Sequence, residues 1–309
     1  MSVTRADALR VTTLEEFADA LEPALDRAVS VVIPAFNEAG HVADQVRAVD
    51  EVLRSSGWAF EILVVDDGST DGTAAAAAEA GVRVIRHRRN RGYGAALKSG
   101  VAAAKYDWTL ITDADGTYPA AAIPQLLAHA DDNDMVVGAR TGGTVRIPTA
   151  RKPAKWFLGK LASYLAGQQL PDLNSGLRLM RRSLVARYAH LLPSGFSFTT
   201  TITLACACNE HPVQYVPIDY HARLGESKIR PRHAYDFLLL ILRTIVFFNP
   251  LKVFIPLGAV LALIGLAKFV YDVFKGNLSE SAIFGLLAAL IVWAVGLLAD
   301  QNARIAAKR

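Results

Sequence analysis

Residues 108–115 read WTLITDAD, a short apolar run that ends in two aspartates. Similar apolar runs recur through the first 140 residues, separated by stretches with helical periodicity or a high alanine content. Such alternation is typical of a parallel sheet that carries helices on both faces. We therefore predict an α/β domain with strands at Trp108–Thr112, Val29–Ala35, Ile62–Val65, Val82–Arg86 and Met135–Gly138, and helices at 38–55, 72–80, 94–105 and 120–130.

The two aspartates of this run, Asp113 and Asp115, are the sharpest chemical signal in the chain. Carboxylates at i and i+2 leave an extended strand on the same face, and they offer the hard oxygen ligands that Mg²⁺ and Mn²⁺ prefer. Ligands of open α/β sheets bind beyond the carboxyl ends of the strands, which is where this pair falls. The alternative is a solvated acidic strand end, which the Asp-x-Asp pattern alone does not exclude.

Three further polar segments follow predicted strands. Residues 66–72 (DDGSTDG) close an apolar strand with two acidic groups, and residues 34–38 (PAFNE) close the first strand. Both could be simple turns and helix caps, but at this edge they also predict a wall for a nucleoside. Residues 90–98 (NRGYGAALK) form a glycine-rich turn into a helix. This turn is not a dinucleotide fingerprint, because the third glycine is missing and it follows the third strand.

The second half of the chain is more basic and ends in apolar segments. Residues 251–300 hold two of them, roughly Val253–Tyr271 and Ile283–Ala299, each close to the ~20 residues that span a bilayer. A buried helical hairpin in a soluble core is the alternative. We predict these regions: 1–28 an N-terminal extension of no assigned function, 29–232 the catalytic domain, 233–250 an interfacial amphipathic helix, 251–300 two transmembrane helices and 301–309 a basic tail.

Charge constrains the partners and the orientation. The 309 residues carry a net charge of +4 with a pI of about 9.1, which favours phosphates, nucleic acid or an anionic membrane surface without choosing among them. The first ten residues, MSVTRADALR, lack the apolar region of a signal peptide. Because basic residues flank the outer ends of both apolar segments, the positive-inside rule predicts a cytoplasmic catalytic domain and tail.

In their order, these motifs resemble the nucleotide-sugar half of the family-two glycosyltransferases, which have the Rossmann-like GT-A fold. The matching segments are Pro34-x-x-Asn37-Glu38, residues 66–72, Asn90-x-Gly92-x-Gly94-x-Ala-x-Lys98 and Asp113-Ala-Asp115. Downstream segments resemble the dolichol-phosphate mannose synthase branch and its bacterial polyprenyl-phosphate relatives, in which a two-span C-terminal hairpin also occurs. These are residues 138–140 (GAR), 174–178 (NSGLR) and Arg223-x-x-Gly225-x-Ser227-Lys228. The resemblance covers roughly residues 29–300.

The resemblance implies a role for each matching residue. Asp113, Asp115 and Arg178 would act in catalysis, with Asp115 on a metal at the donor diphosphate. The donor nucleotide would contact Pro34, Phe36, Asn37, Glu38, Asp67, Lys98, Asp113, Ala114, Asp115, Arg223 and Lys228. The acceptor phosphate would contact Arg140, Arg151 and Ser175. The metal, Mg²⁺ or Mn²⁺, would be held by Asp115, Asp113 and Thr117, although relatives often carry Gln where this chain has Thr117.

The implied reaction is the inverting, metal-dependent transfer of a sugar from a nucleotide to a polyprenyl (dolichyl or undecaprenyl) phosphate at the cytoplasmic face of the membrane. A phosphate monoester has a second pKa of about 6, so it is largely a dianion at neutral pH and needs no general base. It needs cations, and the planar fork of arginine suits phosphate oxygens. We expect a UDP-sugar rather than GDP-mannose, a lipid acceptor, a membrane and no nucleic acid, and assembly as a homo-oligomer is left open.

Other readings remain open. Asp172, just before the NSGLR motif, could orient Arg178, touch the donor or cap a turn. A processive polysaccharide synthase would share the donor half, but its Gln-x-x-Arg-Trp motif is absent, since no tryptophan here follows an arginine. The chain could also be a membrane-tethered transferase for a soluble or polysaccharide acceptor. A noncatalytic membrane scaffold is a further alternative, against which the intact Asp67, Asp113 and Asp115 argue.

Overall fold

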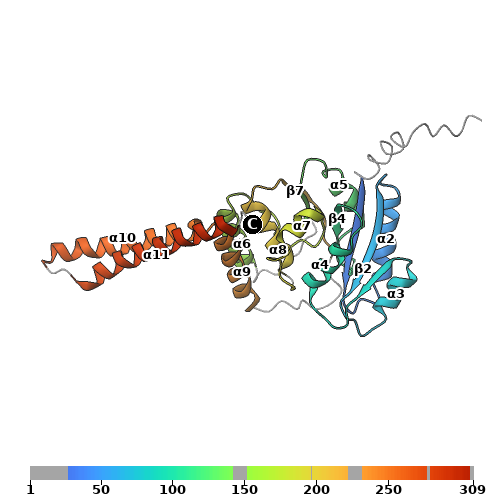
Figure 1. Ribbon diagram of the computed structural model, residues 1–309, viewed down its shortest axis with the longest axis horizontal. Helices are drawn as coiled ribbons and strands as arrows, with labels where there is room; N and C mark the ends of the chain where they lie inside the picture. The colour runs from blue at the N-terminus through green and yellow to red at the C-terminus, as the bar shows by residue number, and fades with distance from the viewer. Residues whose placement is uncertain (1–26, 142–151, 196, 222–231, 277–278, 307–309) are drawn as a thin grey trace, which may run out of the picture.

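A mixed seven-stranded sheet forms the centre of the domain in the computed structural model, which describes residues 27–141, 152–195, 197–221, 232–276 and 279–306 (Figure 1). The strand order is β3-β2-β1-β4-β6-β5-β7. The strands are β1 (Ala28–Ala35), β2 (Ala59–Asp66), β3 (Arg83–Arg86), β4 (Trp108–Ile111), β5 (Met135–Ala139), β6 (Arg178–Arg181) and β7 (Val213–Pro217). The five strands predicted from the apolar runs are therefore confirmed, with ends that differ by at most a few residues.

The five predicted strands run parallel to one another, and the sheet is mixed because β6, which was not predicted, runs in the opposite direction. β1 pairs in parallel with β2 and β4, while β6 runs antiparallel to both β4 and β5. Arg178, the first residue of β6, pairs with Ile111 and Val137 near the carboxyl ends of β4 and β5. The chain thus enters β6 from the carboxyl edge, and residues 172–177 lie at the edge where ligands of such sheets bind.

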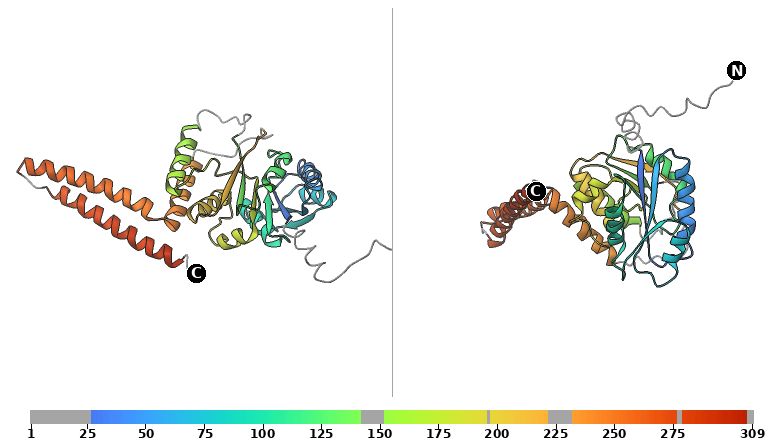
Figure 2. Two further views of the ribbon diagram at one scale, coloured as in Figure 1. Left: turned by 90° about the horizontal axis from the view of Figure 1, so that it is seen from above. Right: turned by 45° about the vertical axis from the view of Figure 1, so that its right-hand side comes forward.

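Helices cover both faces of the sheet because the strand side chains alternate between two apolar cores (Figures 1 and 2). On β1, Val31 and Ile33 pack into the core under α2, α3 and α5, whereas Val32 packs into the core under α4, α7 and α8. These helices are α2 (Val42–Arg54), α3 (Thr73–Glu79), α4 (Tyr93–Ala103), the 3₁₀ turn η1 (Ala120–Ala122) with α5 (Ile123–Leu127), α7 (Arg182–Tyr188) and α8 (Phe198–Cys208).

The last helices extend the fold away from the sheet. A third apolar core joins α6 (Lys152–Ala166) and α8 to α9 (Arg232–Phe248). Beyond it, α10 (Leu251–Phe274) and α11 (Glu280–Ala306) form a hairpin that projects from the domain (Figures 1 and 2). Both are candidate membrane spans, with mean hydropathies of 2.3 and 2.6. Only 11% and 17% of the residues in their most apolar stretches are buried. Such exposure does not fit a hairpin buried in a soluble core.

Glycines let the two hairpin helices approach each other closely. A Cβ atom on Gly265 would lie 2.9 Å from Leu286 N, and one on Gly285 would lie 3.0 Å from Gly265 Cα. At the other end of the hairpin, the Trp293 indole N–H donates to the Ile255 carbonyl at 3.2 Å. Small residues at helix contacts are typical of membrane helix pairs, since close backbone approach replaces the hydrophobic driving force there.

Candidate active site

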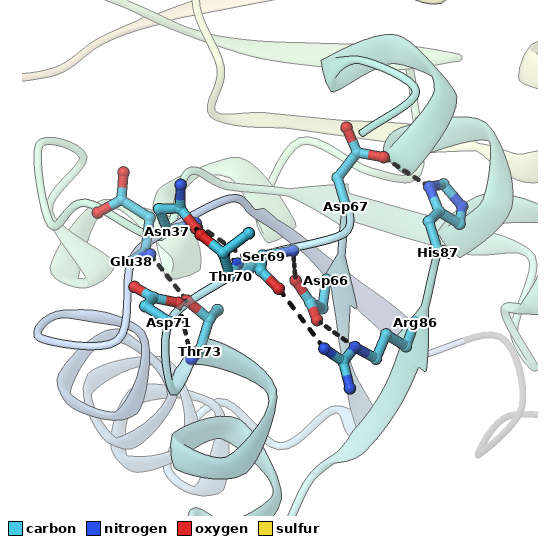
Figure 3. A network of polar contacts seen from close by, with 10 residues as sticks. All are labelled: Asn37, Glu38, Asp66, Asp67, Ser69, Thr70, Asp71, Thr73, Arg86 and His87. Carbon is cyan, nitrogen blue, oxygen red and sulfur yellow. Dashed lines mark hydrogen bonds and ion pairs between the residues drawn. The ribbon is translucent and has the colours of Figure 1, made fainter. Parts of the chain in front are cut away.

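Loops that follow β1 and β2 are joined by hydrogen bonds at the carboxyl edge of the sheet (Figure 3). The Asn37 N–H donates to Ser69 Oγ at 2.9 Å, and the Thr70 N–H donates to Asn37 Oδ1 at 3.0 Å. Asn37 has a φ of 57°, a left-handed conformation that asparagine tolerates better than most residues. The structure therefore brings the two predicted nucleoside segments together into one folded unit.

Asp71 joins the same two loops a second time. Its carboxylate accepts the Ala39 N–H at 3.2 Å and the Thr73 N–H at 3.0 Å. Thr73 Oγ1 in turn accepts the Glu38 N–H at 2.9 Å. The hydrogen bond from the Thr73 hydroxyl is the largest cause that lowers the pKa of Asp71. These contacts fix the backbone on which Glu38 is carried.

Asp67 points away from this unit and towards the loop that follows β3 (Figure 3). Its Oδ1 accepts from His87 Nδ1 at 2.6 Å and from the Arg91 N–H at 3.0 Å, and its Oδ2 accepts the Gly92 N–H at 2.7 Å. The second ring nitrogen of His87 lies 2.9 Å from Ser99 Oγ. Asp67 is only 2% exposed, and its contacts hold the glycine-rich turn in place. A direct contact between Asp67 and the nucleoside, as the family resemblance implies, stays a prediction.

The glycine-rich turn is fixed from its other side by residues 192–195. Cβ atoms on Gly92 and Gly94 would lie 2.5 Å from Ser194 O and 2.2 Å from Pro193 O, so only glycine fits at these two positions. Lys98, predicted to contact the donor nucleotide, instead donates from Nζ to the Leu192 carbonyl at 2.9 Å.

The acidic pair lies directly after β4, as predicted. The Tyr93 hydroxyl donates to Asp113 Oδ1 at 2.9 Å. The Thr117 N–H and hydroxyl both donate to Asp115 Oδ1, at 3.1 and 2.6 Å. Thr117, predicted as a third metal ligand, is 2% exposed and here orients the Asp115 carboxylate. Ala114 between the two aspartates is buried.

Arg140 and Asp172 form a largely buried ion pair at the end of β5. Arg140 Nε and Nη2 each donate to one oxygen of Asp172 at 2.8 Å, and the guanidinium lies over the Tyr220 ring at 5.3 Å. Burial alone would raise the pKa of Asp172, but the hydrogen bonds and charge of Arg140 outweigh it and lower this pKa to about 2. The pair corrects the hypothesis that Asp172 orients Arg178, since it orients Arg140.

Arg178 is the predicted catalytic residue that the structure places furthest from that role. Its side chain is fully buried and donates to the carbonyls of Ser175 at 2.7 Å and Leu173 at 2.8 Å, and to Thr203 Oγ1 at 2.5 Å. Burial lowers the pKa of this guanidinium. In this conformation Arg178 cannot touch a donor diphosphate, because all of these contacts lie inside the protein. It supports the 172–177 loop instead.

The remaining predicted residues divide into three groups. Ser175, predicted at the acceptor phosphate, is fully buried and donates from Oγ to the Gly138 carbonyl at 2.5 Å. Pro34 lies within β1, paired with Val65, and Phe36 is 38% exposed just beyond the strand. The third group lies outside the described residues and comprises Arg151, Arg223 and Lys228.

The oxygen donors of this edge fit a divalent cation. Among the described residues there is no cluster of three or more His, Cys, Asp or Glu side chains that could hold a metal. Magnesium, however, commonly takes one or two carboxylates and completes its shell with water and substrate phosphates. Asp113 and Asp115 supply such a pair, and a hydroxyl donor orients each carboxylate.

Sequence reasoning missed several residues that shape this site. Tyr93 lay within a recognised turn, but its contact with Asp113 spans 20 positions. The Gly176 N–H donates to the Tyr118 hydroxyl at 2.6 Å, and a Cβ on Gly176 would lie 2.8 Å from Asp113 Oδ2. Only the position of Gly176 in the NSGLR motif could have pointed to it. His87 carried no motif signal at all.

Family comparisons match both parts of the chain. Residues 30–189 match Glycosyl transferase family 2, and residues 249–305 match the GtrB C-terminal hairpin. An undecaprenyl-phosphate 4-deoxy-4-formamido-L-arabinose transferase of Enterobacter sp. (strain 638) is 31% identical over 304 residues, which cover 90% of this chain and 88% of that protein. A dolichyl-phosphate hexose transferase of Haloferax volcanii is 31% identical over 205 residues, covering 66% of this chain and 87% of the relative.

Solved structures with the same fold are more distant in sequence. A glucosyl-3-phosphoglycerate synthase of Mycobacterium tuberculosis, in complex with Mn²⁺, UDP and phosphoglyceric acid, aligns with a TM-score of 0.58 at 21% identity, covering 74% of this chain and 82% of that one. The same enzyme with Mg²⁺ and UDP gives a TM-score of 0.57 at 20% identity, covering 73% and 82%. At this identity the likeness supports the fold alone.

Proposed function

Because this chain belongs to glycosyl transferase family 2 and ends in a hairpin of the GtrB type, we propose that it transfers a sugar from a nucleotide to a polyprenyl phosphate. The relatives named above carry undecaprenyl phosphate or dolichyl phosphate in their names. One observation carries the proposal: a paired acidic site at the carboxyl edge of the sheet and an exposed apolar hairpin occur in one chain. A transferase for a lipid acceptor needs both.

For the donor half, we propose that Asp113 and Asp115 hold Mg²⁺ or Mn²⁺ on the diphosphate. A metal bound there supplies positive charge that stabilises the departing nucleoside diphosphate. Asp115 is kept in position by Thr117, and Asp113 faces the ribose or the donor sugar. The loop unit around Asn37 lines the nucleoside end, with Phe36 at its exposed rim. We propose a UDP-sugar as the donor, and the structures of the same fold that contain UDP with Mn²⁺ or Mg²⁺ make this nucleotide the first to test.

For the acceptor half, we propose that Arg140 contacts the lipid phosphate. Asp172 occupies Nε and Nη2 of Arg140, which sets the plane of the guanidinium, and the other donors of the fork are the ones we assign to phosphate. Asp172 stays ionised throughout the neutral range because its pKa is about 2. The acceptor phosphate is already largely a dianion, so no side chain has to remove a proton. A single displacement at the sugar then inverts its anomeric centre.

For the orientation, we propose that α10 and α11 cross the membrane and leave the domain on the cytoplasmic side. Arg304 lies near the end of α11, and Arg243 and Lys252 lie before and at the start of α10. The positive-inside rule places such residues in the cytoplasm. The exposed Tyr235 and Leu239 of α9 fit an interfacial position beside the hairpin.

A partition assay tests whether the acceptor is a lipid or a soluble molecule. A soluble acceptor is included because one solved structure of the same fold contains phosphoglyceric acid. The full-length protein in detergent is given Mn²⁺ or Mg²⁺ and labelled UDP-glucose, UDP-N-acetylglucosamine or GDP-mannose. Undecaprenyl phosphate, dolichyl phosphate and 3-phosphoglycerate serve as acceptors. We expect label to enter the organic phase with a polyprenyl phosphate. Label that stays in water, or that reaches only 3-phosphoglycerate, would overturn the lipid acceptor.

A further inference from the structure

Tyr93 lies beside the acidic pair and contacts Asp113 directly. It is the first residue of α4, and its hydroxyl donates to Asp113 Oδ1 at 2.9 Å. The ring is partly buried against the apolar core under α4, α7 and α8. A hydroxyl that donates to a charged acceptor makes a strong directional contact.

The backbone that carries Tyr93 is fixed on two sides. On one side, Asp67 accepts the N–H groups of Arg91 and Gly92 at 3.0 and 2.7 Å. On the other, the Ala95 N–H donates to the Ser194 carbonyl at 3.0 Å. The backbone that carries the tyrosine therefore cannot shift without breaking contacts to two separate loops.

The loop before β6 also approaches the Asp113 carboxylate. A Cβ atom on Gly176 would lie 2.8 Å from Asp113 Oδ2, and the Gly176 N–H is held by the Tyr118 hydroxyl at 2.6 Å. The Asp113 carboxylate thus has two close neighbours, the Tyr93 hydroxyl that donates to Oδ1 and the Gly176 backbone beside Oδ2. Together they restrict the positions that this carboxylate can take.

We propose that Tyr93 is a positioning residue that aims the Asp113 carboxylate at the metal and the donor diphosphate. The inference rests on the proposed function, since it needs Asp113 to act there. Through the Gly92 turn, Tyr93 also links Asp113 to Asp67, so two acidic residues far apart in the sequence are held by one short segment. We assign Tyr93 no contact of its own with the metal or the sugar, since its hydroxyl donates to the Asp113 carboxylate.

The test compares Tyr93→Phe with Tyr188→Phe in the full-length protein. Tyr188 is a matched control because its hydroxyl lies 2.9 Å from His211 Nε2 and His211 in turn pairs with Asp134. None of the site residues that the structure describes belongs to this network. Binding of Mn²⁺ in the presence of UDP, and in parallel GDP, is followed by electron paramagnetic resonance, and turnover is measured with the partition assay. Since a hydrogen bond to a charged group is lost, we expect Tyr93→Phe to weaken Mn²⁺ binding and lower kcat by about 10- to 100-fold.

The outcomes separate this inference from the proposed function. If the wild-type protein binds Mn²⁺ and turns over, and Tyr93→Phe matches it in both, the positioning role is wrong while the function stands. If Tyr93→Phe lowers only the yield of folded protein, with unchanged kcat per folded molecule, Tyr93 is merely structural and the inference is again overturned. A wild-type protein that binds no Mn²⁺ with either nucleotide would overturn both.

Discussion

Replacing Asp67 by asparagine should release the glycine-rich turn from the sheet. Both carboxylate oxygens accept hydrogen bonds, Oδ1 from His87 and the Arg91 N–H and Oδ2 from the Gly92 N–H. An asparagine has one oxygen, so in either orientation its NH₂ group faces a backbone N–H. At least one partly buried backbone N–H then loses its acceptor, which costs about 2 kcal/mol. For a domain of this size, we expect Tm to fall by roughly 4 to 8 °C.

The assay for Asp67→Asn is thermal unfolding of the detergent-solubilised protein together with donor kinetics. The turn borders the predicted nucleoside wall, so the donor KM should rise more than kcat falls. Asp50→Asn is the matched control, because Asp50 only pairs with Arg54 on the exposed face of α2, and such pairs contribute little. An Asp67→Asn protein with the Tm and donor KM of the wild type would refute the idea that this carboxylate holds the turn.

Two further predictions concern stability and the hairpin. The pKa of Asp172 is about 2 in the folded protein, against an ordinary 3.8. The ionised carboxylate therefore stabilises the fold by about 2 kcal/mol above pH ~4, and this contribution disappears as the pH falls towards 2. The difference in unfolding free energy between wild type and Asp172→Asn should shrink over that pH range, and a constant difference would contradict the pairing with Arg140. Gly265→Val should force α10 and α11 apart, because even a Cβ atom at this position would lie 2.9 Å from Leu286 N. Protease protection of the hairpin in liposomes should fall in this variant, whereas Val260→Leu, at an exposed position, should leave it unchanged. Equal protection of both variants would argue against close packing of the two helices.

The order of the first elements could be predicted because each signal was local. Apolar runs fixed β1 to β5, and the acidic pair could be placed at the tip of β4 from the run that precedes it. β6 was missed because only Leu179 and Met180 separate its terminal arginines, and its antiparallel pairing depends on residues far away in the chain. No periodicity in four residues could have indicated that direction.

Several predicted site residues proved to support the site from within, for a shared physical reason. The family resemblance implies a catalytic role for Arg178, whereas its guanidinium is buried and donates to two carbonyls and to Thr203. Charged residues are mostly exposed, so a motif alone does not indicate such a buried position. Asp67 similarly accepts from backbone N–H groups 24 and 25 positions away. Motif residues show which positions matter, but their hydrogen-bond partners come from tertiary packing.

Transfer by Asp115→Ala, measured beside the wild type with and without chelator, tests the central claim most directly. Purified wild-type protein with a labelled donor and undecaprenyl phosphate should place label in the organic phase, lose this activity in excess EDTA and regain it on adding Mn²⁺ or Mg²⁺. Asp115→Ala should fold and insert normally and transfer nothing under any of these conditions. Wild-type rates in the variant, or full transfer in chelator, would contradict a metal held by the two aspartates.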